Sequence, residues 1–209
     1  MPRVKQRTDE LHERGVAAAL AVLAEEGVTG LTTRNVARRA EASVPAVYEV
    51  FGDKAGLIRE VFFRGFRLLG DALAALPPAD DPLDGLRDVA AGYRAFVVAN
   101  PVLAEVMFSR PFADFDPSTA DDKAGVKVRK IFVERVRLAV DAGLIAGDPT
   151  DIALVFFGLL EGLTAAENAR RLGSSKASVN RRWRLGLTAL FAGLQPASGT
   201  PKPAKEQRP

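Results

Sequence analysis

The fold of this chain is decided by one stretch of sequence, Thr32-Thr-Arg-Asn-Val-Ala-Arg-Arg-Ala-Glu-Ala-Ser-Val-Pro-Ala-Val-Tyr-Glu-Val-Phe51. It predicts two short helices, the first running to Ala40 after a cap at Thr32 or Thr33, joined by a turn of about three to four residues. Apolar residues return once per helical turn, and Ala37 is small where the two helices would cross. The stretch is typical of a helix-turn-helix, whose second helix enters the major groove of DNA.

The second helix of this stretch, Val44 to Phe51, leaves several residues facing outward near its start once its apolar face is buried. These residues are Val44, Pro45, Ala46, Tyr48 and Glu49. Residues at such positions contact base edges and phosphates in a major groove. We therefore expect this face to carry the DNA contacts.

Two residues depart from the usual helix-turn-helix pattern. Glu41 stands at the turn position that usually carries glycine with a positive φ, and a side chain there costs on the order of 1 kcal/mol. Glu49 places a negative charge near phosphates, which is repulsive unless its carboxylate accepts a hydrogen bond from cytosine. The stretch is therefore weakly charged, and its affinity for DNA should depend on additional contacts.

Helical periodicity dominates the rest of the sequence, and no alternating strand pattern is found. An all-α fold is therefore expected. The helices expected outside the helix-turn-helix span residues 8–27, 55–76, 83–99, 101–109, 118–143 (irregular near Gly125), 149–172 and about 175–194.

Composition excludes several classes of function. Hydrophobic residues make up 47% and charged residues 26% of the 209 residues, as in ordinary globular proteins, and there is no cysteine and one histidine, His12. No metal or other cofactor is expected, and His12 is expected to be a solvated helix residue. The longest apolar run, Ala153 to Leu160, is short for a membrane span, and no secretory signal is found, so a cytoplasmic location is expected.

The net charge of +3 permits DNA binding without requiring it. Arg3, Lys5 and Arg7 are expected to form a basic arm ahead of the first helix. Such an arm contacts phosphates where a DNA-reading element follows it.

The motifs around this stretch resemble the N-terminal domain of TetR-family transcriptional regulators. They comprise a helix ending in Leu-Ala-Glu-Glu-Gly27, then Leu31-Thr-Thr-Arg-Asn-Val-Ala37, Val47-Tyr48 and Phe51-Gly-Asp-Lys54-Ala-Gly-Leu57. The remainder is similar to the ligand-binding and dimerisation domain of that family. The segment from Tyr93 to Phe108 resembles the subgroup with a Trp-His-Gly signature, although the corresponding stretch here reads Leu160-Glu-Gly162.

The resemblance implies roles for individual residues. Thr33 would cap the second helix and meet phosphate, followed by Arg34 in the groove-proximal turn. Tyr48 would direct its hydroxyl at a phosphate and Lys54 would clamp another. Val44, Pro45 and Ala46 would contact thymine methyl groups. The implied domains are a DNA-binding domain at 1–54, an effector-binding and dimerisation domain at 55–195, and a disordered tail at 196–209.

Two apolar stripes near the C-terminus predict a homodimer of paired helices. The first is a row of small residues that lets another helix approach closely, and the second is a stripe of large residues on the last helix. The positions expected in the interface are Gly158, Gly162, Ala165, Ala169, Trp183, Leu187 and Leu190. An intrachain core is the alternative for both stripes. A dimer would match a palindromic operator with two half-sites.

The family fold also implies a cavity for a small hydrophobic effector. Its expected lining is Phe96, Met107, Phe108, Phe132, Phe157 and Glu161. Aromatic residues at helical spacing are also ordinary core residues, and Glu161 would otherwise pair with an arginine at the dimer interface.

The sequence therefore predicts a DNA-binding repressor that a hydrophobic small molecule releases from a palindromic operator. The alternative is a DNA-binding regulator without a small-molecule effector. A helical-bundle enzyme is not expected, because the paired Glu-x-x-His ligands of di-metal bundles are absent.

Overall fold

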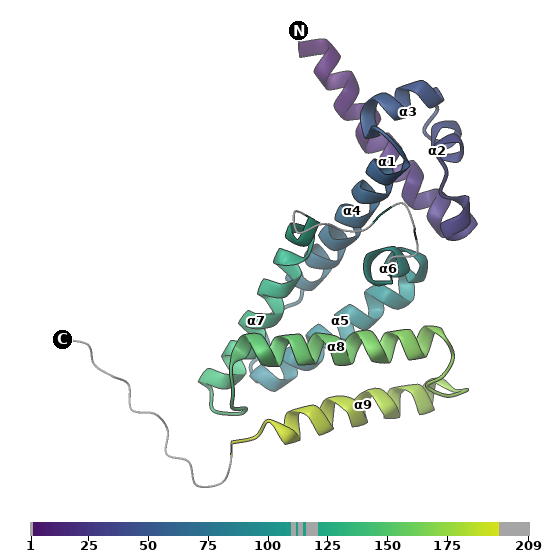
Figure 1. Cartoon of the computed structure of the whole chain (residues 1–209). Coiled ribbons are helices and arrows are strands. Elements are labelled where there is room, and N and C mark those ends of the chain that lie inside the picture. Colours follow the sequence, from purple (N-terminus) through teal and green to yellow (C-terminus); the bar gives the residue numbers. More distant parts are fainter. Residues whose placement is uncertain (1, 110–111, 113–114, 116–120, 197–209) are drawn as a thin grey trace, which may run out of the picture. The chain divides into compact units, whose positions relative to one another are not determined.

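The computed structural model describes the backbone of residues 2–109, 112, 115 and 121–196, and the side chains of residues 2–7, 121 and 122 lie outside the description. Every regular element within this part of the chain is a helix, which confirms the all-α fold class (Figure 1). The elements are α1 (Pro2–Gly30), α2 (Thr33–Arg39), α3 (Val44–Phe51), α4 (Lys54–Ala74), α5 (Pro82–Ala99), α6 (Pro101–Phe108), the 3₁₀ helix η1 (Asp121–Gly125), α7 (Val126–Asp141), α8 (Pro149–Asn168) and α9 (Lys176–Gly193).

These helices form two compact units. The first unit comprises Met1–Leu76 and Ala91–Ile131, and the second comprises Pro77–Ala90 and Phe132–Pro209. The first unit therefore holds α1 to α4, α6 and η1, whereas α8 and α9 belong to the second. The predicted tail spans residues 196–209, and all of it beyond Pro196 lies outside the described part of the chain.

Local capping explains where most helices begin. The side chains of Thr32, Ser43, Asp53, Asp148 and Ser175 each accept a hydrogen bond from a backbone N–H in the first turn of α2, α3, α4, α8 and α9 respectively. Each bond satisfies a donor that the helix itself leaves unpaired. The caps of α2, α8 and α9 are among those expected from the sequence, and these helices begin close to their predicted starts.

Two helix boundaries were predicted wrongly. The first helix begins at Pro2 rather than at Thr8, since no residue between them breaks a helix. It kinks at Gly27, which has a φ of 71°, so the expected break is present although the helical turns continue to Gly30. The eighth helix ends at Asn168 rather than at Leu172, because Arg170 takes a left-handed conformation with a φ of 57°.

Close helix crossings organise the core of the first unit. The α1 helix meets α3 where a Cβ atom on Gly15 would lie 2.6 Å from Cε2 of Phe51. The α4 helix meets α6 where a Cβ atom on Gly65 would lie 2.6 Å from Sδ of Met107. These glycines allow helices to approach closer than any larger residue would.

Aromatic rings fill the core of the second unit. The ring centroid of Phe156 lies 5.5 Å from that of Phe132 and 5.8 Å from that of Phe191. Trp183 is 4% exposed, and its Nε1 donates a 2.7 Å hydrogen bond to Oε2 of Glu167. This bond joins α9 to the end of α8 and satisfies the one polar atom of the indole.

The α8 helix combines high hydropathy with low burial. Its most apolar window has a mean hydropathy of 1.3, and 28% of that window is buried. By length and composition, α8 is the single helix in the described part of the chain that could cross a membrane, whereas α5 and α6 qualify only as a pair bent by 107°. Uncovered apolar residues on a helix also arise where another protein covers them.

Candidate functional site

The turn between α2 and α3 has the geometry that the sequence predicts. Glu41 has a φ of 52°, so the turn position does take the left-handed conformation despite carrying a side chain. The N–H of Ala42 donates a 3.0 Å hydrogen bond to the carbonyl of Ala37, closing the end of α2. The Ser43 side chain then caps α3, whose first turn contains Pro45. The helix-turn-helix therefore spans the predicted residues.

A polar network ties α2 to the end of α1. Nδ2 of Asn35 donates a 2.8 Å hydrogen bond to Oε2 of Glu26 and a 3.0 Å bond to the carbonyl of Gly30. Arg39 donates two hydrogen bonds of 2.5 Å to the carboxylate of Glu25, and these bonds lower the pKa of Glu25. Arg38 lies 3.6 Å from Glu26. Arg38 and Arg39 therefore help to fix α2 of the helix-turn-helix against α1, a role that was not predicted from the sequence.

The α3 helix divides cleanly into a buried and an outward face. Val47 and Phe51 are 0% and 8% exposed and pack inward, as predicted. Tyr48 is 47% exposed, and Pro45 is exposed beside it. Of the remaining candidates, Val44 and Ala46 are half-buried and Glu49 is exposed. The aromatic hydroxyl and the small apolar residues therefore share a surface that can enter a groove.

The structure corrects the role expected for Thr33. The cap of α2 is Thr32, whose Oγ1 accepts a 3.2 Å hydrogen bond from the N–H of Asn35. Thr33 is the first helical residue and is 9% exposed, so its side chain packs inward instead of capping. A contact of Thr33 with phosphate would therefore use its backbone N–H. Arg34, the next residue, is exposed.

Lys54 is the first residue of α4, after the cap Asp53, whose Oδ1 accepts a 2.7 Å hydrogen bond from the N–H of Gly56. Its Nζ lies 5.7 Å from the centre of the Phe112 ring, a cation–π distance. The ring limits the directions in which the ammonium group can point. Lys54 is therefore positioned by an aromatic residue far away in the sequence.

The residues expected to form a basic arm ahead of the first helix are part of that helix in the structure. Arg3 and Lys5 belong to α1, because the helix already begins at Pro2. Their side chains lie outside the described part of the chain. Their predicted phosphate contacts stay predictions.

His12 and Glu13 connect α1 with α4. Nε2 of His12 lies 3.3 Å from Oε2 of Glu60, and the imidazole stacks on Phe51 with ring centroids 5.3 Å apart. Glu13 accepts a hydrogen bond from Arg64, which is the main cause of its lowered pKa. His12, whose side chain is 31% exposed, therefore packs against Phe51 while keeping contact with solvent. Nothing in the local sequence indicates either pair.

Two family models match the chain. One, described as bacterial regulatory proteins of the tetR family, matches residues 16–61 and so covers the helix-turn-helix. The other, described as a tetracyclin repressor-like C-terminal domain, matches residues 86–190, which is half of the chain. The chain belongs to the TetR family of transcriptional regulators. It is therefore a DNA-binding regulator by family.

Solved structures share the fold of this TetR-family chain. A protein of unknown function from Rhodococcus sp. RHA1 is 27% identical with a TM-score of 0.75, over 89% of this chain and 96% of that one. A TetR-family transcriptional regulator from Haemophilus influenzae RD is 18% identical with a TM-score of 0.65, over 91% and 100%. A TetR variant from Acinetobacter baumannii AYE, solved with minocycline, is 20% identical with a TM-score of 0.60, over 86% and 93%. No curated protein matches.

The residues expected to line an effector cavity fall in both units of the TetR-family chain. In the first unit, Phe96 is half-buried, Met107 is buried against Gly65, and the half-buried Phe108 ring lies 5.6 Å from Phe66 and 6.0 Å from Tyr93. These side chains contact core residues of their own unit.

In the second unit, the Phe132 ring is 1% exposed and lies 5.4 Å from the half-buried ring of Phe157. Glu161 is half-buried, and this burial raises its pKa. The carboxyl group of Glu161 is therefore partly removed from solvent. The side chains described here include no ion-pair partner for Glu161.

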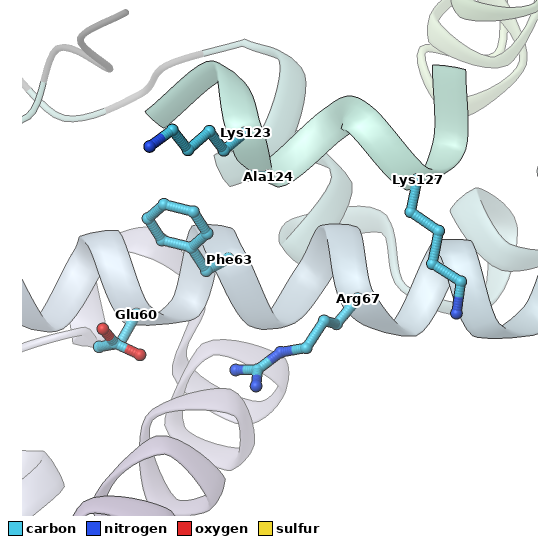
Figure 2. Close-up of a pocket in the computed structure, with 6 residues that line it drawn as sticks. All are labelled: Glu60, Phe63, Arg67, Lys123, Ala124 and Lys127. Carbon is cyan, nitrogen blue, oxygen red and sulfur yellow. The ribbon is translucent and has the colours of Figure 1, made fainter. Parts of the chain in front are cut away.

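A hollow is present elsewhere in the first unit, between α4 and the η1–α7 junction. Its volume is about 450 Å³, and its lining contains none of the predicted effector residues (Figure 2). The lining residues are Glu60, Phe63, Arg67, Lys123, Ala124 and Lys127. We call it the α4–η1 groove.

No described residue of the chain covers the small-residue row that begins at Gly158 on α8. All four of its members, Gly158, Gly162, Ala165 and Ala169, are exposed. A Cβ atom added at Gly158 or Gly162 would meet no atom within 4 Å. Leu154 on the same face is 56% exposed. This face is therefore apolar and exposed among the described residues.

The apolar stripe on α9 that was expected in the dimer interface packs inside the chain instead. Trp183 is buried and Leu187 and Leu190 are half-buried, which corrects the expectation that Trp183 is an interface residue. The neighbouring Gly186 faces α8, with its Cβ position 3.4 Å from Cδ1 of Leu163. The stripe marks the intrachain packing of α9, and the 67% exposed Leu185 lies on its open side.

Proposed function

We propose that this TetR-family chain is a homodimeric repressor that binds a palindromic operator and is released from it by a hydrophobic small molecule. The observation that carries the proposal is the outward face of α3, with its exposed tyrosine and small apolar residues. It belongs to a helix-turn-helix whose α2 is tied to α1 by a polar network. The proposal treats residues 1–54 as the DNA-binding domain and 55–195 as the effector and dimerisation domain. A cytoplasmic location follows from binding DNA.

The DNA contacts divide into two classes. Arg3, Lys5, Thr33, Arg34, Tyr48 and Lys54 contact phosphates and position the protein. Val44, Pro45 and Ala46 contact thymine methyl groups and supply sequence preference. Since Arg38 and Arg39 pair with Glu26 and Glu25, fewer positive charges remain for the phosphates than the sequence suggests. Two half-sites in one dimer compensate by doubling the contacts.

The experiment that tests DNA binding is selection from random duplexes, followed by Tyr48→Phe on the selected site. A hydrogen bond to a charged group contributes about 1.5–3 kcal/mol, so losing the hydroxyl should raise the operator Kd about tenfold or more without altering the Tm. Equal Kd values for both proteins at matched salt would exclude the phosphate contact of Tyr48.

Two variants that each remove one positive charge distinguish a direct phosphate contact from a general loss of charge. Arg34→Gln should weaken binding and reduce the salt dependence of log Kd by about one unit. Arg129→Gln removes the same charge from α7, outside the proposed DNA surface, and serves as the control. If both variants weaken binding equally, Arg34 does not contact phosphate. A failure to select any site would contradict the proposed function itself.

The proposed effector is largely hydrophobic, because the candidate residues are aromatic apart from Met107 and Glu161. It would favour a conformation in which α4 moves the helix-turn-helix out of register with DNA. A difference of a few kcal/mol in affinity between the two conformations suffices for release. The resemblance to the Trp-His-Gly subgroup stays a prediction and does not narrow the ligand class.

A thermal-shift screen of hydrophobic metabolites and drugs tests the effector. Hits should raise the Tm with concentration and should lower operator affinity. Phe108→Ala and Phe157→Ala should each reduce the ligand-induced shift, whereas Leu68→Ala, a change at an exposed leucine, should not. The alternative, a regulator without a small-molecule effector, predicts no hit that alters operator binding.

A further inference from the structure

Two phenylalanines from the segment between α6 and η1 are buried against the N-terminal half of α4. Phe112 is 8% exposed and Phe115 is 4% exposed, and the N–H of Phe115 donates a 3.3 Å hydrogen bond to the carbonyl of Phe112. The centroid of the Phe115 ring lies 5.6 Å from that of Phe62 on α4. Burial and the hydrogen bond between them therefore fix the positions of both rings.

Each of these rings faces a cation of α4. Nζ of Lys54 lies 5.7 Å from the centre of the Phe112 ring. Cζ of Arg59 lies 5.5 Å from the centre of the Phe115 ring. Both distances fall within the range of about 6 Å for cation–π interactions, in which the ring attracts the cation without cancelling its charge. Arg39, by contrast, is paired with a carboxylate.

The two cations differ in their position on α4. Lys54 is its first residue, where the partial positive charge of the helix N-terminus disfavours an ammonium group. A lysine side chain also has many rotamers, and ordering it when a phosphate binds costs affinity. A ring that holds the ammonium group in place reduces both costs. Arg59 lies in the second turn and is not among the proposed DNA contacts, so the Phe115 pair provides a matched comparison.

We infer that Phe112 is a positioning residue for DNA binding, because its ring holds the Lys54 ammonium group at the start of α4, directly after the helix-turn-helix. A residue of the proposed effector domain thereby raises operator affinity without touching DNA. This role rests on the proposed function, and within it on the phosphate contact of Lys54.

The first test compares ring variants on the selected operator at matched salt. Phe112→Leu keeps an apolar side chain but removes the ring, and should raise the Kd about threefold per half-site and so about tenfold for the dimer. Phe112→Tyr keeps the ring and should stay within twofold of the parent. Phe115→Leu removes the ring over Arg59 and is the control, expected to lower the Tm as Phe112→Leu does but to leave the Kd within twofold.

A double-mutant cycle separates positioning from a structural role. Lys54→Gln should raise the Kd and reduce the salt dependence of log Kd. In the Lys54→Gln background, Phe112→Leu should change the Kd less than twofold, because no ammonium group remains to be positioned. Equal losses in both backgrounds would overturn the inference. So would tighter binding by Phe112→Leu, equal losses in Phe112→Leu and Phe115→Leu, or a Lys54→Gln variant that binds like the parent.

A measurement without DNA tests the contact itself. The ring current of Phe112 should shift the ε-methylene proton resonances of Lys54 upfield in NMR spectra of the full chain. This shift should disappear in Phe112→Leu and persist in Phe115→Leu, and its absence from the parent would overturn the inference. A failure to select any operator would contradict the proposed function, whereas an operator that Phe112→Leu binds as tightly as the parent does would overturn the role of Phe112 alone.

Discussion

At the scale of single residues, two positions with an unusual backbone conformation fix where helices end. Glu41 and Arg170 are the two described non-glycine residues with positive φ, at 52° and 57°. Glu41 closes the helix-turn-helix, and Arg170 ends α8. Both positions store strain that a glycine would not.

Glu41→Gly should therefore stabilise the chain. Removing a left-handed side chain gains on the order of 1 kcal/mol, and the greater freedom of glycine in the unfolded chain offsets part of it. We expect the free energy of unfolding to rise by about 0.5 kcal/mol in urea titrations. Glu49→Gly removes the same side chain from the interior of α3, where φ is helical, and should lower stability by roughly 1 kcal/mol. A destabilised Glu41→Gly variant would contradict the strain argument.

At the scale of elements, α8 and α9 show how one pattern supports two assignments. Each carries apolar residues at helical spacing, and each was expected in an interface. The structure leaves the α8 row uncovered and turns the Trp183 stripe of α9 inward. The open side of α9 also carries an apolar residue, the 67% exposed Leu185, so apolar residues alone do not identify the buried face.

Gly162→Leu should dissociate the proposed dimer while leaving the helix intact. A Cβ atom at position 162 would meet no described atom within 4 Å, and leucine favours helix more than glycine does. Light scattering should show a monomer, with unchanged helical circular dichroism. Ala95→Leu enlarges an exposed residue on α5 and is the control, expected to stay dimeric. A dimeric Gly162→Leu variant would exclude the α8 face from the interface.

At the scale of the whole molecule, burial and charge couple folding to pH. Burial raises the pKa of Glu161 above its ordinary value, so the folded chain holds this proton more tightly than the unfolded chain does. The stability that Glu161 contributes is therefore highest at low pH and falls as pH rises from the unfolded pKa through the raised folded one. At neutral pH the carboxylate is ionised, and its partial burial then lowers stability.

Glu161→Gln should consequently raise the Tm at pH 7. It should have little effect below about pH 4, where the Glu161 carboxyl is mostly protonated in both the folded and the unfolded chain. Glu105→Gln, at an exposed position on α6, controls for the loss of charge itself. Thermal melts across this pH range provide the measurement. A Tm that instead falls at pH 7, together with loss of the dimer, would mean that Glu161 pairs with a basic group of a second copy.

The sequence by itself determined the local features of this protein. Caps at Asp148 and Ser175, and the left-handed turn at Glu41, follow from interactions within a few residues. The boundaries of α3 and the outward position of Tyr48 follow for the same reason, since helical periodicity orients every residue once one face is buried.

Only the tertiary structure decided which distant residues meet. Lys54 lies over Phe112, His12 beside Glu60, and Arg39 on Glu25, and no spacing in the sequence indicates these pairs. It also decided that Trp183 turns inward, toward Glu167. The physical reason is that an apolar or charged residue specifies only that it needs a partner, whereas the packing of whole helices specifies which partner it finds.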